Sequence, residues 1–492
     1  MINKLIIENF RSIKHVEIDL GMINAFIGPN NAGKSNVMKA LNIILGDVYP
    51  SIRSFDEKDF HNYDTSNPIK IEVRFGSPLH FNKDVHGFQL TFDGKNCEYL
   101  AIDSQGKVVT DLSSGREVRV SNKMKDEVAL MYLGLDRQAP QQIRATQWTL
   151  YGKLLRHIEK QIDEPIKEQF KKRIKDAYDS HISSSLNTME FLLKKIVEEQ
   201  TGLKLSLRLS LIDPIEIIKN LRPYLKENEF SPEFDSEDMG TGTQSALAIG
   251  IARAYAEIVK QPLVLAIEEP ELYLHPHGCR HFYKLLKDFS KNGVQIIYTT
   301  HEKSFVDISN FESIHLLRKE AGETKVYSGA KKGVSSHEEI KMASKFDETI
   351  NEVFFANYVI LEEGELDKIA CKIALEKLGI ELDKKGISII DCGGNTAIKP
   401  IAEVLNFFKI PTAALLDEDP GNQKTSDIIN ELRKLLGQNN VFLKSPNLEG
   451  EWKLSQKPTK AEAIEIFSKK SESEIPEVYR DIIKDFLIRG EL

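Results

Sequence analysis

Apolar and polar residues alternate along the first part of the chain, a pattern typical of β-structure. Residues 2–10 and 14–20 follow this two-residue period, and it continues from about 69 to 135. Asp93-Gly94 and Gln105-Gly106 are turn signals within the longer stretch. A period of two places successive side chains on opposite faces of a strand, so we expect half-buried antiparallel strands here.

Between residues 140 and 200 the apolar period changes to four. A step of four residues moves an apolar stripe by about 40° per turn, so one straight helix would carry it around its whole circumference. We expect breaks at 163–165, where Pro165 suits a first turn, and at the serine run 183–185. The segment is either a helical hairpin that serves as a dimerisation element or a set of ordinary core helices. The stripe consists of Leu154, Ile158, Ile162, Ile166, Phe170, Ile174, Tyr178, Ile182 and Leu186.

Five short apolar runs are typical of buried parallel strands. Two of them, 263–267 and 295–300, are separated by one predicted helix. The other three, 358–361, 387–390 and 412–416, alternate with helical patterns. Repeated strand–helix units predict a small α/β sheet in the C-terminal third.

Composition narrows the class of protein. The 492 residues are 41% hydrophobic, enough for the cores of two to four domains. The formal net charge of −8 excludes a global basic field, so any DNA contact would need a local basic patch. The four cysteines form no Cys-x-x-Cys pair, and neither a signal peptide nor an apolar segment of membrane-spanning length is evident. We therefore expect a cytoplasmic protein without a membrane partner.

Residues 28–35 have the spacing Gly-x-x-x-x-Gly-Lys-Ser between an apolar strand and a helix start, which is the pattern of a P-loop. Its backbone N–H groups and the helix N-terminus favour phosphate. Lys34 is expected to reach the β- and γ-phosphates of ATP, and Ser35 to hold Mg²⁺. The nucleotide-binding residues predicted in this stretch are Asn30, Asn31, Ala32, Gly33, Lys34, Ser35 and Asn36.

Acidic residues follow the two central strands. Glu268 and Glu269 end the first strand, where buried charges are costly unless they serve a metal ion or a water. Glu268 fits a magnesium contact, and Glu269 fits polarisation of the attacking water. His301 ends the next strand, where it is placed to sense a γ-phosphate. A glycine turn at 240–244 opens a helix and predicts a second anion site, whose residues are Thr241, Gly242 and Gln244.

The three C-terminal strands also end on acids. Glu362-Glu363 follows the first strand, Asp391 the second, and Asp417-Glu418-Asp419 the third. Parallel strands present their carboxyl ends at one edge, where such sheets bind ligands. Converging carboxylates there suit Mg²⁺ or Mn²⁺.

The order of P-loop, glycine turn, acidic strand end and histidine resembles the ABC-type ATPases of DNA maintenance, such as the structural-maintenance-of-chromosomes and RecF-like proteins. The opening residues 6–13, which include Arg11, are similar to theirs. The resemblance implies that Arg11 contacts nucleotide, and that 240–244 of one subunit covers ATP bound to the other in a head-to-head dimer. Two departures are Thr241 and Thr243 in the turn, and Glu268 where Asp is commoner.

The C-terminal third resembles a Toprim domain, the metal site shared by topoisomerases, primases and OLD (overcoming lysogenization defect) nucleases. The residues that match the Toprim metal ligands are Glu363, Asp367, Asp417 and Asp419. The doublet leaves Glu362 or Glu363 as the ligand, and the glycine spacing favours Glu363. Glu449 resembles a late metal-binding acid, and Lys444 is the candidate basic residue beside the scissile phosphate.

Together these matches resemble the OLD nucleases, which include GajA-like subunits of Gabija antiviral systems. The fold expected is an α/β ABC-type P-loop ATPase at 1–345 with a helical insertion at 140–200. A Rossmann-like Toprim nuclease domain follows at 350–450, and a helical extension at 451–492.

The resemblance implies an ATP-hydrolysing, Mg²⁺- or Mn²⁺-dependent DNA endonuclease of anti-phage defence or DNA processing. Its partners would be DNA, further copies of itself in a homodimer or homotetramer, and a helicase-like or other defence protein. The alternative is an ATPase sensor or scaffold whose Toprim fold binds a partner or DNA without cutting. A topoisomerase would need a tyrosine nucleophile on a separate DNA-gate domain, and no segment offers one.

Overall fold

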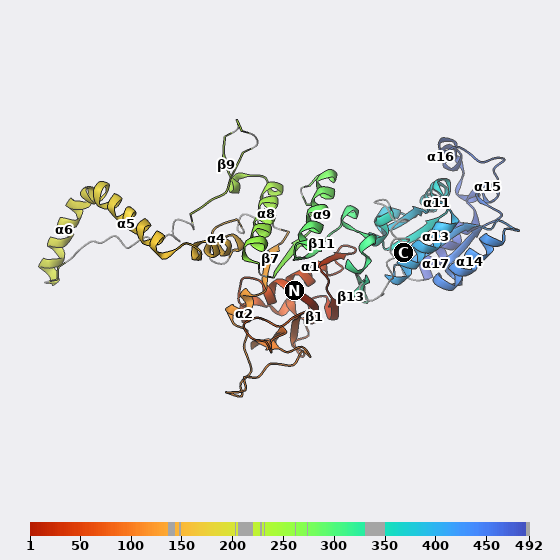
Figure 1. Cartoon of the computed structure of the whole chain (residues 1–492). Helices are drawn as coiled ribbons and strands as arrows, with labels where there is room; N and C mark the ends of the chain where they lie inside the picture. The colour runs from red at the N-terminus through yellow and green to blue at the C-terminus, as the bar shows by residue number, and fades with distance from the viewer. Residues whose placement is uncertain are drawn as a thin grey trace. The chain divides into compact units, whose positions relative to one another are not determined.

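The computed structural model describes residues 1–135, 143–146, 149–201, 203–204, 220–226, 229–230, 232–260, 262–272, 274–329 and 350–488. The chain separates into two compact units, Met1–Tyr132 with Val264–Leu492, and Leu133–Leu263, which are described separately (Figure 1). The predicted end of the ATPase domain at residue 345 lies outside the described residues. Within those residues, no helix is long and apolar enough to cross a membrane.

The N-terminal sheet of the first unit is antiparallel throughout, as the two-residue period predicts. Its strand order is β2-β1-β4-β5-β6. Helix α1 (Lys34–Leu45) packs against this sheet. The strands are β1 (Ile2–Phe10), β2 (Ile13–Asp19), β4 (Ile69–Phe75), β5 (Gly87–Phe92) and β6 (Cys97–Ile102).

A second sheet carries the P-loop strand near its centre, in the order β13-β12-β3-β11-β10-β7. Strand β3 is parallel to both neighbours, whereas β12 and β13 form an antiparallel hairpin. Helix α9 (Pro276–Lys291) connects β10 to β11. The strands are β3 (Ile23–Ile27), β7 (Ala129–Leu133), β10 (Leu263–Glu268), β11 (Val294–Thr299), β12 (Ile314–Glu320) and β13 (Glu323–Ser328).

Strand β7 corrects one sequence expectation. It falls within the stretch predicted to pair with the antiparallel strands, yet it lies beside β10 in the second sheet. Ala129, Leu130, Met131 and Leu133 are all buried, so the strand is covered on both faces. A continuous apolar run of this kind belongs in an α/β layer rather than on a half-exposed sheet.

One hydrophobic core joins the two sheets. It contains Ile71 and Phe88 of the first sheet, Met38 and Leu41 of α1, and Ala266 of the second sheet. The P-loop helix is thus packed from several sides, which fixes the start of α1 where the phosphate-binding turn ends.

The C-terminal domain of the first unit, shown in blue tones in Figure 1, is built on a parallel sheet of order β15-β14-β16-β17. The three strand–helix units predicted from the sequence are present, and β17 adds a fourth strand. The strands are β14 (Tyr358–Glu362), β15 (Ile387–Asp391), β16 (Thr412–Asp417) and β17 (Val441–Lys444). The helices are α11 (Glu365–Lys377), α12 (Leu382–Lys385), α13 (Asn395–Phe407), α14 (Gln423–Leu436) and α15 (Leu448–Glu451).

Residues beyond 450 complete the core of this domain. Trp452, Phe467 and Tyr479 are buried in the same cluster as Tyr358 and Leu415. The Trp452 indole N–H donates to the Tyr479 hydroxyl at 3.1 Å. Helix α16 (Lys460–Lys469) packs against α11, and α17 (Glu477–Ile488) packs against α11 and β17, so both helices contact this domain.

The second unit is mainly helical and breaks where the sequence predicts. Helix α4 (Leu150–Lys160) is followed by α5 (Glu164–His181), which has Pro165 in its first turn, and then by α6 (Ser183–Thr201). Helix α8 (Thr241–Val259) packs against α4. Several apolar side chains of α5, α6 and the residue between them are exposed, and Ile166 and Ile182 among them belong to the four-residue stripe; the exposed residues include Ile166, Ile182, Phe191, Leu192 and Ile196.

Candidate functional site

The P-loop is a turn that requires glycine at two positions. Gly28, directly after β3, has a φ of 135°, and Gly33, directly before α1, has a φ of 106°. A Cβ atom on Gly28 would lie 2.2 Å from the carbonyl oxygen of Leu317. A Cβ on Gly33 would lie 2.3 Å from Oγ1 of Thr324. The glycines therefore let the loop pack tightly on β12 and β13.

Thr324 holds this turn from a distant part of the chain. Its hydroxyl donates to the Ala32 carbonyl at 2.9 Å and lies 2.6 Å from the Ser12 hydroxyl. The Thr324 N–H donates to the Ser12 carbonyl at 2.8 Å, and the Asn36 amide donates to the Ser12 hydroxyl at 2.8 Å. We call this the Ser12–Thr324 contact. Sequence analysis did not identify either residue, because no local pattern shows that β13 pairs beside β12 over the P-loop.

Lys34 is buried and its ammonium faces neutral oxygens. It donates to the carbonyls of Gly28 at 2.8 Å and Pro29 at 2.9 Å. Burial lowers the pKa of Lys34 to about 8, although the nearby carboxylates of Glu269 and Glu271 act in the opposite direction. A desolvated ammonium with only carbonyl partners is a strong site for a phosphate group.

A hollow of about 640 Å³ lies over the P-loop, within the range of small-molecule sites. It is lined by the predicted P-loop residues other than Ala32, together with Glu269 and His301. These residues meet because the ends of parallel strands lie at the same edge of a sheet. Ser12 and Lys319 also line it and were not predicted. Ala32 is buried behind the turn. The lining residues are Ser12, Asn30, Asn31, Gly33, Lys34, Ser35, Asn36, Glu269, His301 and Lys319.

Glu268 has an arrangement that suits a cation. It is 5% exposed, and its Oε1 accepts a hydrogen bond from the Tyr132 hydroxyl. Its Oε2 is buried and has no hydrogen-bond partner among the described residues. A buried carboxylate oxygen without a partner is costly, so a bound cation would relieve it.

Glu269 and His301 face each other beside Lys34. The His301 Nε2 lies 3.7 Å from Glu269 Oε1, and the His301 backbone N–H donates to Glu271 Oε1 at 2.7 Å. Burial, followed by the charge of Lys34, lowers the pKa of His301 to about 4. The imidazole is therefore neutral near pH 7 and can donate a hydrogen bond to a phosphate oxygen. Glu271, which sequence analysis did not single out, fixes the backbone of this sensor.

Arg11 lies beside the first turn of α1. Its Nε donates to Asp59 Oδ1 at 2.7 Å, and its Nη1 donates to Asn36 Oδ1 at 3.3 Å. The side chain thus reaches the P-loop helix without lining the hollow. Its predicted contact with nucleotide remains a prediction.

The glycine turn predicted at 240–244 belongs to the second unit. Gly240 is the N-cap of α8, so the turn opens a helix as expected. Gln244 is buried, and its amide donates to the carbonyls of Ser236 at 3.2 Å and Glu237 at 2.9 Å. These bonds hold the turn on the segment before it.

The edge of the C-terminal sheet gathers carboxylates around Lys444. The ammonium lies 3.3 Å from Glu362 Oε2 and 3.4 Å from Asp417 Oδ1, and it donates to Asp367 Oδ1. Glu363 joins the group because its Oε1 accepts the Asp417 N–H at 2.8 Å. We call these five residues the Lys444 cluster. It unites three predicted metal-binding residues from the ends of β14, α11 and β16.

Burial separates the two members of the glutamate doublet. Glu362 is fully buried against Lys444, and burial raises the pKa of this carboxyl to about 7. Glu363 is only partly buried, on the side of Asp417. Only Glu363 is accessible from outside the domain, which agrees with the glycine spacing.

Lys444 does not have the environment predicted for it. A residue beside a scissile phosphate must reach the surface, but Lys444 is 0% exposed. Its three carboxylate neighbours outweigh the effect of burial and raise its pKa well above the usual value. The ammonium is already surrounded by carboxylates, and its predicted contact with the scissile phosphate remains a prediction.

Asp419 and Glu449 lie outside the Lys444 cluster. The Asp419 N–H donates to the Pro446 carbonyl at 3.0 Å. Burial, and then the charges of neighbours that include Asp367 and Asp419, raise the pKa of Asp417. Glu449 is in the short helix α15. Within the described residues, no hydrogen bond or ion pair joins Asp419 or Glu449 to Lys444.

The C-terminal edge fits a divalent cation by its donor chemistry. Its groups are carboxylate oxygens, which hard cations prefer, and a positive group already sits among them. In the part of the chain that the structure describes, no three acidic, histidine or cysteine side chains form a ready ligand set. A bound ion would therefore have to draw Glu363, Asp367 and Asp417 closer together.

Comparisons with known proteins match both halves of the chain. A family model described as an AAA ATPase domain matches residues 1–105 and 80–306. A model described as an overcoming lysogenization defect protein-like TOPRIM domain matches residues 354–419. These matches confirm the predicted fold class, an ABC-type ATPase followed by a Toprim domain.

Three relatives extend over most of the chain. An OLD nuclease of Thermus scotoductus is 30% identical over 85% of this chain and 82% of its own length. The Old nuclease of Escherichia phage P2 is 24% identical over 84% and 76%. Endonuclease GajA of Bacillus cereus is 21% identical over 89% and 79%. By its similarity over most of both chains and its two domain matches, this chain belongs to the OLD nuclease family.

Proposed function

We propose that this chain is an ATP-hydrolysing DNA endonuclease that cuts phosphodiester bonds with Mg²⁺ or Mn²⁺. The proposal rests on one observation: this chain has two separate sites with acidic residues at the ends of parallel strands. These sites are the P-loop hollow and the Lys444 cluster. The names of the three relatives support the same activity.

At the first edge, the roles follow from charge and position. Lys34 binds the β- and γ-phosphates, Ser35 and Glu268 hold the nucleotide's metal ion, and neutral His301 donates to the γ-phosphate. Glu269 lines the same hollow beside Lys34 and polarises the attacking water. The remaining P-loop residues and Arg11 position the phosphates and α1. The unpartnered Oε2 of Glu268 supports this division of roles.

At the second edge, Glu363, Asp367, Asp417, Asp419 and Glu449 hold the divalent ion. A metal ion there supplies a Lewis acid and lowers the pKa of a bound water. The residues of the chain orient the site. Lys444 neutralises the inner carboxylates and fixes Asp367 and Asp417, and the buried carboxylate of Glu362 balances the charge of Lys444. The partly exposed Glu363 faces the side from which DNA would approach.

We further propose that two copies associate, with Thr241, Gly242 and Gln244 of one covering ATP on the other. The exposed apolar residues of α5 and α6 support a homodimer or homotetramer built through this segment. Deletion of 150–195 is expected to lower the mass measured by light scattering while ATP binding persists. A folded deletion variant of unchanged mass would contradict this assignment.

The wider setting is proposed from the family. We place the ATPase domain at 1–345, the Toprim domain at 350–450 and its closing helices at 451–492. The role that we propose is anti-phage defence or DNA processing in the cytoplasm, with a helicase-like or other defence protein as partner. All four cysteines are free, which agrees with a reducing compartment.

The direct test is plasmid cleavage by purified protein. Supercoiled DNA is incubated with Mg²⁺, Mn²⁺ or EDTA, each with and without ATP, using the wild type, Asp417→Ala and Asp383→Asn. Asp383→Asn is the matched control because Asp383 lies on α12 of the same domain, outside the Lys444 cluster. We expect metal-dependent nicking by the wild type and the control, and none by Asp417→Ala. Equal nicking by all three proteins would refute the assignment to this site, and no cutting by the wild type would favour a DNA-binding scaffold.

A further inference from the structure

Residues 350–357, which we call the connector, lead directly into strand β14. They comprise the short helix η8 (Ile350–Phe355) with Ala356 and Asn357. Strand β14 begins at the next residue and ends at Glu362, one residue before Glu363. Whatever fixes the connector therefore also fixes the strand that carries the proposed metal ligand.

On one side, the connector is bonded to the segment that follows His301. Asn351 is 6% exposed, and its amide donates to the carbonyls of Lys303 at 3.1 Å and Val306 at 2.9 Å. The ring of Phe355 packs on the ring of His301, with centroids 6.3 Å apart and planes inclined by 37°. The γ-phosphate sensor proposed above thus touches the connector directly.

A second contact comes from the strand beside the P-loop. Arg318 lies on β12, which pairs with β3, and the next residue, Lys319, lines the nucleotide hollow. The two terminal nitrogens of Arg318 donate to the carbonyls of Ala356 at 3.1 Å and Asn357 at 3.0 Å. A planar guanidinium that bonds two consecutive carbonyls fixes their orientation more strictly than a lysine could.

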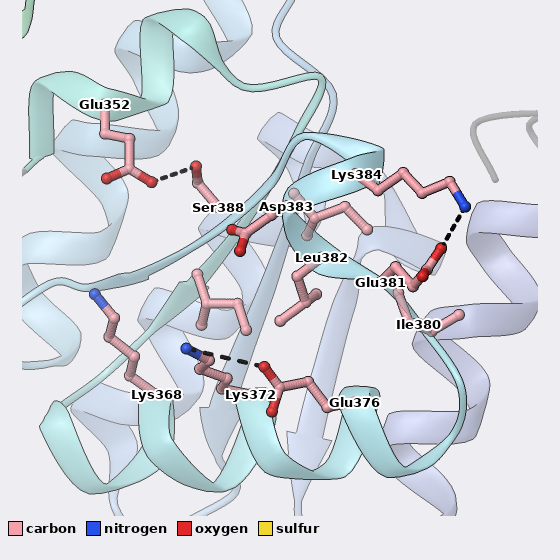
Figure 2. A pocket seen from close by; sticks show the side chains of 12 residues that line it. Glu352, Lys368, Lys372, Glu376, Ile380, Glu381, Leu382, Asp383, Lys384 and Ser388 are labelled. Atoms are coloured by element: carbon pink, nitrogen blue, oxygen red, sulfur yellow. Dashed lines mark hydrogen bonds and ion pairs between the residues drawn. The ribbon is translucent and has the colours of Figure 1, made fainter.

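On the other side, the connector is bonded to the Toprim sheet. Glu352 accepts a hydrogen bond from the Ser388 hydroxyl of β15 at 2.7 Å, and Figure 2 shows the two side chains pointing toward each other across the start of that strand. The buried Phe354 packs edge-on against Phe408, at the end of α13, at 5.5 Å. The N-terminus of α13 returns to the metal edge, where the Gly394 N–H donates to the Glu363 carbonyl at 2.6 Å.

We propose that the connector couples the two sites, with Arg318 and Asn351 as positioning residues that transmit the state of the nucleotide site to β14. Binding of ATP at His301 and beside Lys319 changes the surfaces on which Phe355 and the Ala356–Asn357 carbonyls rest. Because the connector is bonded on both sides, this change alters the position of Glu363 and hence the cleavage rate. The proposal rests on the proposed function for both sites and names the regulation between them.

The test compares Arg318→Met with Arg318→Lys and Lys325→Met. Arg318→Met keeps the aliphatic stem and removes both donors, and Arg318→Lys retains one charged donor. Lys325→Met is the matched control, because Lys325 lies on the neighbouring strand β13 and pairs with Glu323. Asn351→Leu tests the second contact. For each protein, plasmid cleavage is measured with and without a non-hydrolysable ATP analogue, together with the Kd for the analogue.

We expect the nucleotide to change the wild-type cleavage rate by about 5- to 150-fold, the usual size of coupling between two sites. In Arg318→Met and Asn351→Leu this ratio falls toward one, whereas the Kd for the analogue stays at the wild-type value. Arg318→Lys restores part of the ratio, and Lys325→Met leaves it unchanged. A full ratio in both Arg318→Met and Asn351→Leu would overturn the proposal.

A readout without cleavage separates this proposal from the nuclease assignment. Backbone hydrogen exchange of 356–362 is followed with and without the analogue. The wild type should show a change in exchange that Arg318→Met loses. If the wild type cuts DNA but shows neither a rate ratio nor an exchange change, the coupling is wrong and the nuclease stands. If it does not cut DNA but the exchange change appears and depends on Arg318, the nuclease assignment fails and the coupling stands.

Discussion

Two buried lysines show how differently the two sites of this protein are built. Lys34 faces the neutral carbonyls of Gly28 and Pro29, and burial lowers its pKa to about 8. Lys444 lies among three carboxylates that raise its pKa well above the usual value. The first ammonium is still available to bind an anion, whereas the second is already neutralised and organises its neighbours. The same side chain is thus a ligand receptor at one edge and a structural cation at the other.

The largest expected effect comes from removing a carboxylate at the second edge. Asp417→Ala or Glu363→Ala should reduce DNA cleavage by about 10⁴-fold or more, as removal of one member of a catalytic unit does. ATP hydrolysis should not change, because the nucleotide site has its own acids. Plasmid nicking and phosphate release, measured on the same preparations, test both statements. Parallel loss of the two activities would mean that the edges are not independent.

Breaking the ion pair beneath that edge should destabilise the domain. Lys444→Met leaves Glu362 buried without its cation, which typically costs about 3–5 kcal/mol. The double variant Glu362→Leu/Lys444→Met removes both charges and should recover much of that stability. Urea unfolding of the three proteins measures this effect. Equal stability of the wild type and Lys444→Met would show that the pair is not coupled in the fold.

Removing the other lysine should affect binding rather than folding. Lys34→Ala should weaken ATP binding by about 100-fold, the usual loss for a desolvated charge contact. Glu269→Gln should bind ATP normally and lose turnover. Lys14→Ala is a suitable control, because Lys14 is an exposed lysine of the same domain. Equilibrium titration with a fluorescent ATP analogue would disprove the P-loop assignment if Lys34→Ala bound like the control.

The smallest effect is a difference in pH response. Lys34 loses its proton near pH 8 in the free protein, so the Kd for ATP should be constant below that pH and rise by up to about tenfold per unit above it. Lys444 stays charged over the same range because its pKa is raised. ATP titrations between pH 7 and 9.5 test this difference. A Kd that does not change up to pH 9.5 would show that Lys34 is less desolvated than the structure indicates.

The two edges also differ in how well sequence predicts them. The P-loop is recognisable because its glycines, Lys34 and Ser35 all lie within eight consecutive residues, 28–35. Glu269 and His301 could be predicted to lie beside the P-loop because neighbouring parallel strands end at the same edge of the sheet. The Ser12–Thr324 contact could not be predicted, because it depends on the position of β13 beside β12 in the sheet. The order of strands in a sheet is not visible as a local pattern in the sequence.

At the second edge, the sequence predicts which acidic residues lie at the strand ends but not how deeply their neighbours are buried. Glu363, Asp367 and Asp417 follow from strand ends and glycine spacing. Glu362 and Lys444 are buried because residues beyond 450 pack on this domain. No spacing in the sequence relates those residues to β14. The burial of Lys444 could not be predicted for this reason. The same packing explains why the predicted C-terminal extension is part of the Toprim core.

That packing sets an order of events during synthesis. The strands that surround the P-loop are complete once β13 has left the ribosome at residue 328. The core around β14 must wait for Phe467, Tyr479 and Ile482. A chain whose synthesis stops between residue 328 and these core residues has its nucleotide-binding half but lacks a complete hydrophobic core in the nuclease domain.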